Sequence, residues 1–466
     1  MTAIVTSKFR TLNAENFKED IASAGTSVFV GIGKTDVWSN STSDTTDASP
    51  FTPYDTIDSL VEARENLFSM KLLGSSDVSH VVPRHTWTTG STYVAWDSDD
   101  ADIFDKKFYV ITSEFKVYKC LFAPGTTSTQ EPTQTLTDPT AESDNYIWKY
   151  MYTVAVADAE KFLTTSYMPV KTINLSSFAN DGAAEAALSE GDYAQYLNQK
   201  ASLNSSTAGG IERIEVTANG TGYTSDPTIT ITGAGTGATA TVTRTNNTVT
   251  ALTVTAKGTD YSTAHISISG GGGSDATARA VLSPEDGHGV DPVKELGAFF
   301  VAVNTLLDGA GGSESDLTVG NDFRQITLIK NPVNYGTTTI STSQTRKATP
   351  GMSFASTTGT FQVDEVISQG TGASRVEAFI TEIDVGNGIY YYNQNSKTGY
   401  GKFLHTGGTV TGATSGATGT PTSAANTFNT NPDIEKHSGD IVFLENRNPI
   451  DRISSQIEDI KIIIEF

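Results

Sequence analysis

Residues 211–243 read IERIEVTANGTGYTSDPTITITGAGTGATATVT, and residues 249–281 repeat this pattern as VTALTVTAKGTDYSTAHISISGGGGSDATARAV. The equivalent glycines Gly220 and Gly258 are 38 residues apart. Alternating Val, Ile and Thr are typical of half-buried strands, and glycine at a fixed offset is typical of a recurring bend. The duplication therefore predicts paired β-modules over residues 205–285, because a flexible linker would show no such alternation.

A second low-complexity stretch, residues 350–427, has a weaker internal echo and predicts another small β-module. Denser apolar patterning resumes between and after the two stretches. The predicted fold class is therefore mainly β, with a discontinuous β-sandwich-type core, a few short helices and two inserted β-modules. The core is predicted to comprise residues 1–204, 286–349 and 428–466, and the first insertion residues 205–285.

The N-terminal 75 residues predict both helix and strand. Asn13 is the predicted cap of a first short helix, and residues 28–32 form an apolar run that predicts a strand. Thr56 is the predicted cap of a second helix, which Gly74 would end. The predicted buried stripe of that helix consists of Ile57, Leu60, Val61, Leu67, Phe68 and Leu72.

The middle of the chain contains further apolar periodicity. Residues 108–122 predict two strands, and residues 183–201 have helix-forming composition interrupted by Gly191. Residues 146–152 alternate with period two, which places aromatic side chains on one face of a strand. Such a face is suited either to a protein interface or to the core. The aromatic residues are Tyr146, Trp148, Tyr150 and Tyr152.

The C-terminus also alternates, which predicts a final strand with one apolar face. Burying four large apolar side chains would contribute roughly 6 to 12 kcal/mol, comparable with the net stability of a domain. The strand is therefore predicted to be essential for folding. The side chains on this face are Ile460, Ile462, Ile464 and Phe466.

Composition limits the classes of partner. The chain has 466 residues, with 31 Lys and Arg against 53 Asp and Glu, for a formal net charge of −22. This charge would repel nucleic-acid phosphates and anionic membranes, and the sequence has no apolar run of about 20 residues that would span a bilayer. Cys120 is the only cysteine, which excludes an intrachain disulfide and fits a reducing cytoplasm. The N-terminus has no readable secretory signal.

Two local motifs resemble ligand-binding sequences, but each lacks residues that its site requires. The sequence GIGKT at 31–35 follows an apolar run, as in a phosphate-binding loop, but Val28 occupies the place of the first glycine and no helix-forming sequence follows. Asp102 and Phe108 occupy the places that a calcium-binding EF-hand loop reserves for Gly and Glu. We therefore predict a solvated acidic turn, formed by Asp97, Asp99, Asp100, Asp102 and Asp105.

No other constellation assigns a catalytic, cofactor-binding or metal-binding residue. The histidines show no helical i, i+4 pair for zinc, and no GxSxG nucleophile motif occurs. Cys120 lies in a predicted strand, which favours a buried, inert thiol over a nucleophile. Acidic residues are plentiful, yet none is singled out as half of a glycosidase-like pair. The six histidines are His80, His85, His265, His288, His405 and His437.

Both ends of the chain contain distinctive segments: AIVTSKFRT at 3–11 and, near the C-terminus, HSGDI at 437–441, ENR at 445–447 and Pro449-Ile450. These segments resemble the eighth-gene baseplate wedge protein family of T4-like phages. The resemblance covers roughly residues 1–200, 290–335 and 430–466, and not the two insertions. Internal matching segments occur in the same order: Val82-Pro83-Arg84 with Trp87, VYKCL at 117–121, YIWKY at 146–150, and FRQI at 323–326 leading to Asn331-Pro332.

The resemblance implies a mainly β structural protein that is not an enzyme and needs no cofactor. It also implies a homodimer built into each wedge beside other wedge proteins, located in the tail baseplate of the virion after assembly in the host cytoplasm. The alternative is a receptor- or glycan-binding tail protein whose inserted modules contact the host surface. For that role the repeats offer only Tyr223 and Tyr261, which would equally serve as core residues. A hydrolase acting on the cell envelope has support only from the phage context.

Overall fold

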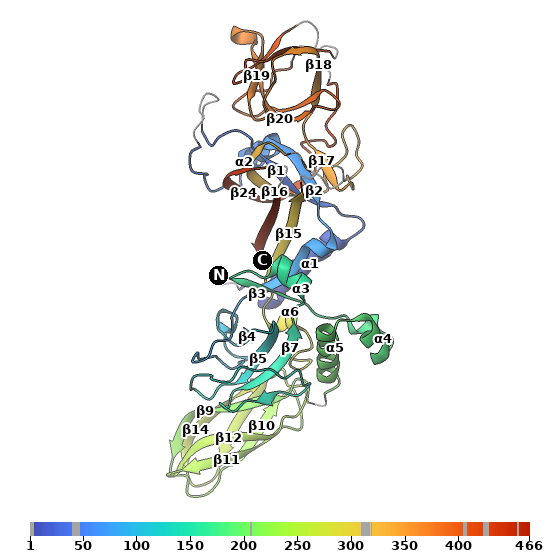
Figure 1. Cartoon of the computed structure of the whole chain (residues 1–466). Helices are drawn as coiled ribbons and strands as arrows, with labels where there is room; N and C mark the ends of the chain where they lie inside the picture. The colour runs from blue at the N-terminus through green and yellow to red at the C-terminus, as the bar shows by residue number, and fades with distance from the viewer. Residues whose placement is uncertain are drawn as a thin grey trace. The chain divides into compact units, whose positions relative to one another are not determined.

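The computed structural model describes residues 4–39, 47–205, 207–308, 317, 319–403, 408–422, 428–453 and 456–466 (Figure 1). Strands account for 40 % of the chain and helices for 16 %, and the strands form several separate sheets. The predicted mainly β class is therefore confirmed. Within these ranges, no helix is both long enough and apolar enough to cross a membrane.

The chain forms two compact units, each assembled from segments that are distant in the sequence. The first unit contains residues 1–15, 79–302 and 463–466, and the second contains residues 16–78 and 303–462. The predicted division into one core with two inserted modules stays a prediction. Four elements belong partly to each unit: α1 (Ser7–Ala22), β3 (Val78–Pro83), β15 (Phe300–Asp308) and β25 (Ile457–Glu465).

The first unit contains a four-stranded antiparallel sheet, which we call the aromatic sheet. Its order is β4 (Tyr109–Ile111), β5 (Lys116–Phe122), β7 (Ile147–Thr153) and β6 (Thr140–Ala141). β4 and β5 are the two strands predicted within residues 108–122. Outside the duplicated sequence, the first unit also contains β3 (Val78–Pro83), β8 (Tyr167–Val170), α3 (Val156–Phe162), α4 (Asp181–Ala187), α5 (Glu190–Leu203) and α6 (Pro292–Glu295).

A β-bulge in β7 divides the predicted aromatic face between two sides of the sheet. Val117 pairs with Tyr152 whereas Tyr118 pairs with Tyr150, so Met151 is the extra residue. Tyr150 therefore packs in one apolar cluster with Tyr118, and Tyr152 packs in another with Val117. All four predicted aromatics are at most 2 % exposed, so they belong to the core and do not form an interface. The individual exposures are 0 % for Tyr146, 1 % for Trp148, 2 % for Tyr150 and 1 % for Tyr152.

The duplicated sequence folds as two interlaced repeats. The first repeat supplies β9 (Ile211–Thr221), β10 (Thr228–Gly233) and β11 (Thr239–Thr245), and the second supplies β12, β13 and β14. One sheet has the order β11-β12-β9-β14, and β10 pairs with β13 in another. Each repeat thus pairs its third strand with the first strand of the other repeat, so neither repeat closes alone. The second repeat comprises β12 (Thr248–Ala256), β13 (Ala264–Ser269) and β14 (Ser274–Leu282).

The repeated tyrosines and glycines form the centre of this module. Tyr223 and Tyr261 are 2 % and 5 % exposed and belong to one apolar cluster. Gly220 and Gly258 have φ angles of 62° and 64°, in the left-handed region. A Cβ on Gly220 would lie 2.9 Å from the ring of Tyr223, and a Cβ on Gly258 would lie 2.8 Å from the ring of Tyr261. The 38-residue spacing therefore preserves a backbone bend that makes room for a buried ring.

Replacing Gly220 with alanine is expected to destabilise the protein by about 1–3 kcal/mol. The new Cβ would lie 2.4 Å from the carbonyl oxygen of Ser274, on a backbone that also disfavours L side chains. Gly270→Ala is the matched control, since Gly270 has a φ of 79° but nothing within 4 Å of its would-be Cβ. Urea unfolding of both variants measures the difference. Equal losses of stability in the two variants would show that the left-handed backbone alone, and not the contact with Ser274, requires glycine at position 220.

The second unit contains a five-stranded sheet around a fully buried strand. Its order is β17 (Thr345–Lys347), β2 (Leu67–Leu72), β1 (Val28–Gly33), β16 (Asp322–Lys330) and β24 (Asp440–Asp451). Every residue of the central β1 is buried, as expected for a continuous apolar run between two neighbours. The predicted strand over residues 28–32 is confirmed by β1.

A closed six-stranded barrel occupies part of the stretch predicted as the second β-module. Residues 404–407 and 423–427 of that stretch lie outside the described residues. Met352, Ile367 and Ile380 are fully buried inside the barrel's apolar cluster. The barrel strands are β18 (Gly351–Thr358), β19 (Val366–Gln369), β20 (Val376–Asp384), β21 (Ile389–Asn393), β22 (Val410–Gly412) and β23 (Thr418–Pro421).

Two helix boundaries differ from the predictions because other caps prevail. α1 begins at Ser7, where the hydroxyl of Thr6 accepts a hydrogen bond from the N–H of Phe9, so Asn13 lies inside the helix and does not cap it. The helical stretch around Gly191 is interrupted before the glycine, at Ser189, whose side chain caps α5. A serine cap supplies an acceptor for free backbone N–H groups, whereas a glycine in the first turn is tolerated.

The helix α2 (Ile57–Asn66) has the predicted cap but the wrong predicted end. The hydroxyl of Thr56 accepts a hydrogen bond from a first-turn N–H group, as expected. The helix stops at Asn66 and not at Gly74, because residues 67–72 leave the helix and pair with β1. The predicted stripe is also wrong in part, since Ile57 and Val61 are 80 % and 42 % exposed.

Candidate functional site

The GIGKT sequence does not form a phosphate-binding loop. Gly31 and Gly33 lie inside β1, and the Lys34 side chain is buried where it forms an ion pair with Asp36 at 3.0 Å. The ammonium also lies 4.8 Å from the centre of the Trp38 ring. Burial lowers the pKa of Lys34. Its charge is thus engaged within the protein.

The acidic run of residues 97–105 is not wholly a solvated turn, which corrects the prediction. Asp97 is part-buried and accepts hydrogen bonds from the guanidinium of Arg279, which hold the pKa of this carboxyl below its usual range. Asp100 forms an ion pair with Lys106. Across the described ranges, no group of three or more His, Cys, Asp or Glu side chains is arranged to hold a metal ion.

The histidines and Cys120 occupy unrelated places. His80 is buried in β3, His265 lies in β13, and Nε2 of His437 lies 2.9 Å from a carboxylate oxygen of Glu65. His405 lies outside the described residues. Cys120 is fully buried, as predicted, and burial raises the pKa of its thiol to about 12.

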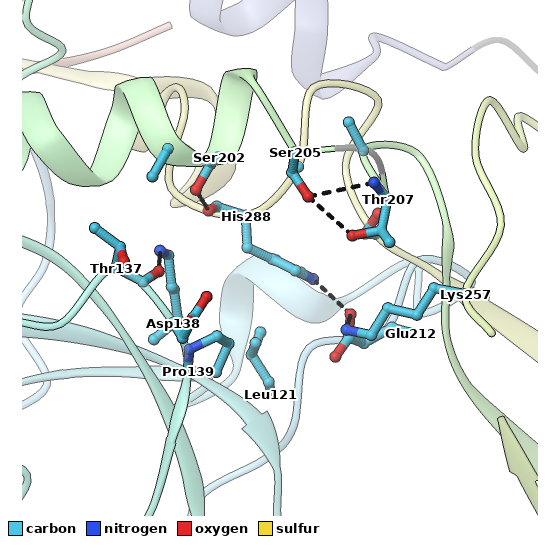
Figure 2. A pocket seen from close by; sticks show the side chains of 15 residues that line it. Leu121, Thr137, Asp138, Pro139, Ser202, Ser205, Thr207, Glu212, Lys257 and His288 are labelled. Carbon is cyan, nitrogen blue, oxygen red and sulfur yellow. Dashed lines mark hydrogen bonds and ion pairs between the residues drawn. The ribbon is translucent and has the colours of Figure 1, made fainter. Parts of the chain in front are cut away.

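His288, in contrast, lines a polar pocket of about 210 Å³ in the first unit (Figure 2). The aromatic sheet contributes Leu121 and Lys149 to its wall, and the first strand of the repeat module contributes Glu212. Figure 2 shows His288 pointing toward Glu212, with Lys257 beside that carboxylate. The other lining residues are Thr137, Asp138, Pro139, Ala201, Ser202, Ser205, Thr207, Ala208, Ser283 and Gly287.

A buried ion pair lies next to this pocket. Lys119 of β5 is fully buried, and its ammonium lies 2.9 Å from a carboxylate oxygen of Glu295 in α6. The same ammonium lies 3.8 Å from the centre of the Trp96 ring. The second oxygen of Glu295 accepts a hydrogen bond from the backbone N–H of Gly289 at 2.7 Å. These contacts compensate for the desolvation of both charges.

The imidazole of His288 lies between two carboxylates but reaches neither. Its Nε2 is 3.7 Å from Glu212 and its Nδ1 is 3.9 Å from Glu295, so neither distance is a hydrogen bond. Neither ring nitrogen has a hydrogen-bond partner among the described residues. Burial, together with the nearby Lys119 and Lys257, holds the pKa of His288 well below its ordinary value. The imidazole is therefore neutral at physiological pH.

The remaining charges of the pocket are held by hydrogen bonds. Burial lowers the pKa of Lys149 to about 8, while its ammonium donates to the amide oxygen of Asn198 at 3.0 Å and to the carbonyl of Thr137. The ammonium of Lys257 donates to Glu212 at 2.8 Å. Lys149, Lys257 and Glu212 thus each have a partner of opposite charge or a polar acceptor.

This arrangement lacks the contacts of a nucleophilic active site. The hydroxyl of Ser202 donates to the backbone carbonyl of His288 and not to its ring, and the hydroxyl of Ser205 is bonded to Thr207. A serine nucleophile needs a base within hydrogen-bond reach. The hydrogen bonds of the pocket instead join Glu212 of β9 to Lys257 within the repeat module, and Lys149 of the aromatic sheet to Asn198 of α5, which is a structural use of charge.

The sequence gives only a weak indication that Lys119 and Lys149 are buried. Lys119 and Lys149 each occupy the middle of an otherwise apolar strand, in KVYKCLF and IWKYMYT. A lysine at such a position requires a buried partner. The partner of Lys119 is Glu295, which is 176 residues away, so strand periodicity did not reveal the pair.

Residues 3–134 match the family model described as Phage-Gp8: Bacteriophage T4, Gp8. The resemblance read from the sequence is confirmed over this range, which includes β1 to β5 and α2. The matched family is that of a structural protein of the phage baseplate wedge, found in the tail baseplate, and the match covers this N-terminal part of the chain. Comparison with curated proteins gives no match.

Proposed function

We propose that this chain is a structural subunit of a contractile-tail baseplate wedge, and that it acts by dimerising and by assembling with other wedge proteins. The observation that carries the proposal is the match of residues 3–134 to the T4 Gp8 family. We further propose that the chain joins the virion after assembly in the host cytoplasm. This role requires no cofactor and no catalytic residue.

The chemistry of the described residues is consistent with a structural role. The charged side chains of Lys34, Lys119 and Asp97 each form an ion pair within the protein. Cys120 is buried with a raised thiol pKa. Buried ion pairs of this kind define which segments pack together and do not create an exposed reactive group.

The alternative of a glycan- or receptor-binding protein has less support. It relied on Tyr223 and Tyr261 as an aromatic platform, but both rings are buried inside the repeat module. A sugar platform requires an exposed aromatic face.

We also propose that residues 205–285 and 350–427 are modules inserted into a core formed by the rest of the chain. For the first module, the entry and exit of the chain are adjacent. The N–H of Gly209 donates to the carbonyl of Pro284, and the N–H of Ser283 donates to the carbonyl of Gly210. A module whose two ends meet can be inserted between neighbouring residues of a host fold.

Analytical ultracentrifugation tests the assembly proposal. The purified chain is expected to sediment as a dimer and to form larger complexes only after other wedge proteins of the same phage are added. The net charge of −22 opposes self-association beyond the dimer. A phage lacking this protein is expected to make heads but no functional baseplates. A stable monomer that ignores those partners, or normal tails in the mutant phage, would refute the proposal.

A further inference from the structure

The second unit has a partly exposed apolar strand at the edge of its sheet. β24 is the last strand in the order β17-β2-β1-β16-β24, and in the described part of the chain no strand pairs with its outer side. It contains four consecutive apolar residues, Ile441-Val442-Phe443-Leu444, none of which is fully buried. An exposed apolar edge strand is an aggregation hazard unless another chain or element covers it.

A bulge in β24 leaves Val442 without a paired residue on the neighbouring strand. Ile441 pairs with Ile329 and Phe443 pairs with Leu328, so Val442 is the extra residue and has no partner on β16. Its side chain is 47 % exposed. Bulges on edge strands prevent regular strand addition and redirect side chains. The bulge therefore disfavours indiscriminate sheet extension and favours recognition through side chains.

A groove of about 350 Å³ runs beside this strand. Its other wall is formed by Pro53, Tyr54 and Asp55, with Leu60 of α2. This volume lies at the lower end of the range of about 300–1,000 Å³ that is typical of concave binding sites. The groove is thus large enough to accept side chains of a partner.

Exposed apolar side chains continue from the groove onto α2. Ile57 and Val61 are one helical turn apart, so they share a face, and Tyr54 is 68 % exposed just before the helix. The sequence pattern predicts a buried stripe here, yet the structure leaves it uncovered. Such a conflict between a local pattern and the fold is expected where a surface serves binding.

The charges around the groove select the kind of partner. Asp55 lines the groove, and the exposed Asp58 and Asp440 lie on the two elements that form it. A second copy of this chain, bound through the same surface, would bring these carboxylates against their own equivalents. A partner segment with Lys or Arg beside its apolar residues would instead be complementary.

We propose that the groove between β24 and α2 binds an apolar segment, flanked by Lys or Arg, of another baseplate wedge protein. We call this surface the β24 groove; it comprises Tyr54, Asp55, Ile57, Asp58, Val61 and residues 440–444. The proposal rests on the proposed wedge function and names the surface through which that function operates. Apolar anchors would supply most of the affinity, and the rim carboxylates would supply partner choice and salt dependence.

The test measures binding of the full-length chain to each of the other wedge proteins, purified separately. The double variant Ile57→Ser with Val442→Ser is expected to weaken binding at least tenfold. The Ile57 and Val442 side chains are both exposed, at 80 % and 47 %, so we expect the fold to be retained, and urea unfolding of the variant checks this. Val385→Ser is the matched control, because Val385 is 85 % exposed in the same unit but outside the groove.

A charge variant provides a second measurement. Asp58→Lys is expected to weaken partner binding several-fold and to reduce the salt dependence of the affinity. Asp105→Lys is the control, because Asp105 is exposed in the other unit, and it is expected to change neither the affinity nor its salt dependence. Normal partner binding by both groove variants would overturn the proposal that the β24 groove is the binding surface, and it would leave the proposed wedge function unaffected. Loss of the dimer with partner binding retained would assign the surface to self-association and overturn the proposal. A wild-type chain that binds no wedge protein would refute the proposed function itself.

Discussion

Deleting residues 459–466 is expected to abolish cooperative folding, because this segment contributes buried side chains to both units. Ile460 and Ile462 are each 2 % exposed in the second unit, and Ile463 packs against an apolar cluster of the first unit. The two buried isoleucines alone account for roughly 3–6 kcal/mol, against about 5–15 kcal/mol for the stability of a whole domain.

The deletion also removes polar contacts at the end of the chain. The N–H of Phe466 donates to the carbonyl of Phe299, and Arg10 donates to the carbonyl of Phe466 at 2.6 Å. Arg10 also forms an ion pair with Glu465. Loss of these contacts would leave the N-terminal helix and the start of β15 without their partners in the first unit.

Point variants separate the strand's side chains from its backbone. Ile460→Ala and Ile462→Ala are each expected to destabilise the protein by about 2–5 kcal/mol, whereas Ile457→Ala should change stability by less than about 0.5 kcal/mol. Ile457 lies on the same strand but is 58 % exposed, which makes it the matched control. Circular dichroism melting and size-exclusion chromatography provide the measurements. A truncated chain that melts cooperatively and remains monodisperse would show that β25 is peripheral.

Replacing Glu295 with glutamine is expected to destabilise the protein by about 3–5 kcal/mol. The change leaves the fully buried ammonium of Lys119 without a counter-charge, while the amide oxygen still accepts the hydrogen bond from Gly289. Glu285→Gln is the control, because Glu285 is exposed. Urea unfolding at neutral pH measures both losses. Equal losses would show that the Lys119–Glu295 pair contributes little.

The double variant Lys119→Met with Glu295→Gln is expected to recover most of the lost stability, because it removes both buried charges. The pH dependence of Glu295→Gln gives a second readout. Burial lowers the pKa of Lys119, so the unfolded chain binds more protons than the folded chain between the two pKa values. Stability of Glu295→Gln should therefore increase as the pH rises toward the ordinary lysine value. A flat profile would show that Lys119 is not the group responsible.

Local patterns in the sequence predicted much of the secondary structure. The 38-residue duplication predicted the repeat module, and Thr56 was correctly identified as the cap of α2. The apolar runs correctly predicted β1 and the pair β4 and β5. Alternation, capping and repetition depend on residues that are close in the chain, which is why they can be read without the fold.

The candidate site depended on contacts that no local pattern encodes. Lys119 and Glu295 are distant in the chain, and the bulge at Met151 that divides the aromatic residues arises from strand register. The sequence also placed Ile57 and Val61 on a buried stripe, whereas the fold leaves them exposed.

The sequence by itself determined the mainly β class, the duplicated module, the acidic charge and the resemblance to the wedge family that the match of residues 3–134 bears out. Only the tertiary structure decided that residues 67–72 leave the helix to pair with β1, that the repeats exchange their third strands, and which charges are buried together. The physical reason is the range of the interactions. Periodicity records which side of an element is apolar, but pairing and burial depend on which distant segments supply the partner strand and the counter-charge.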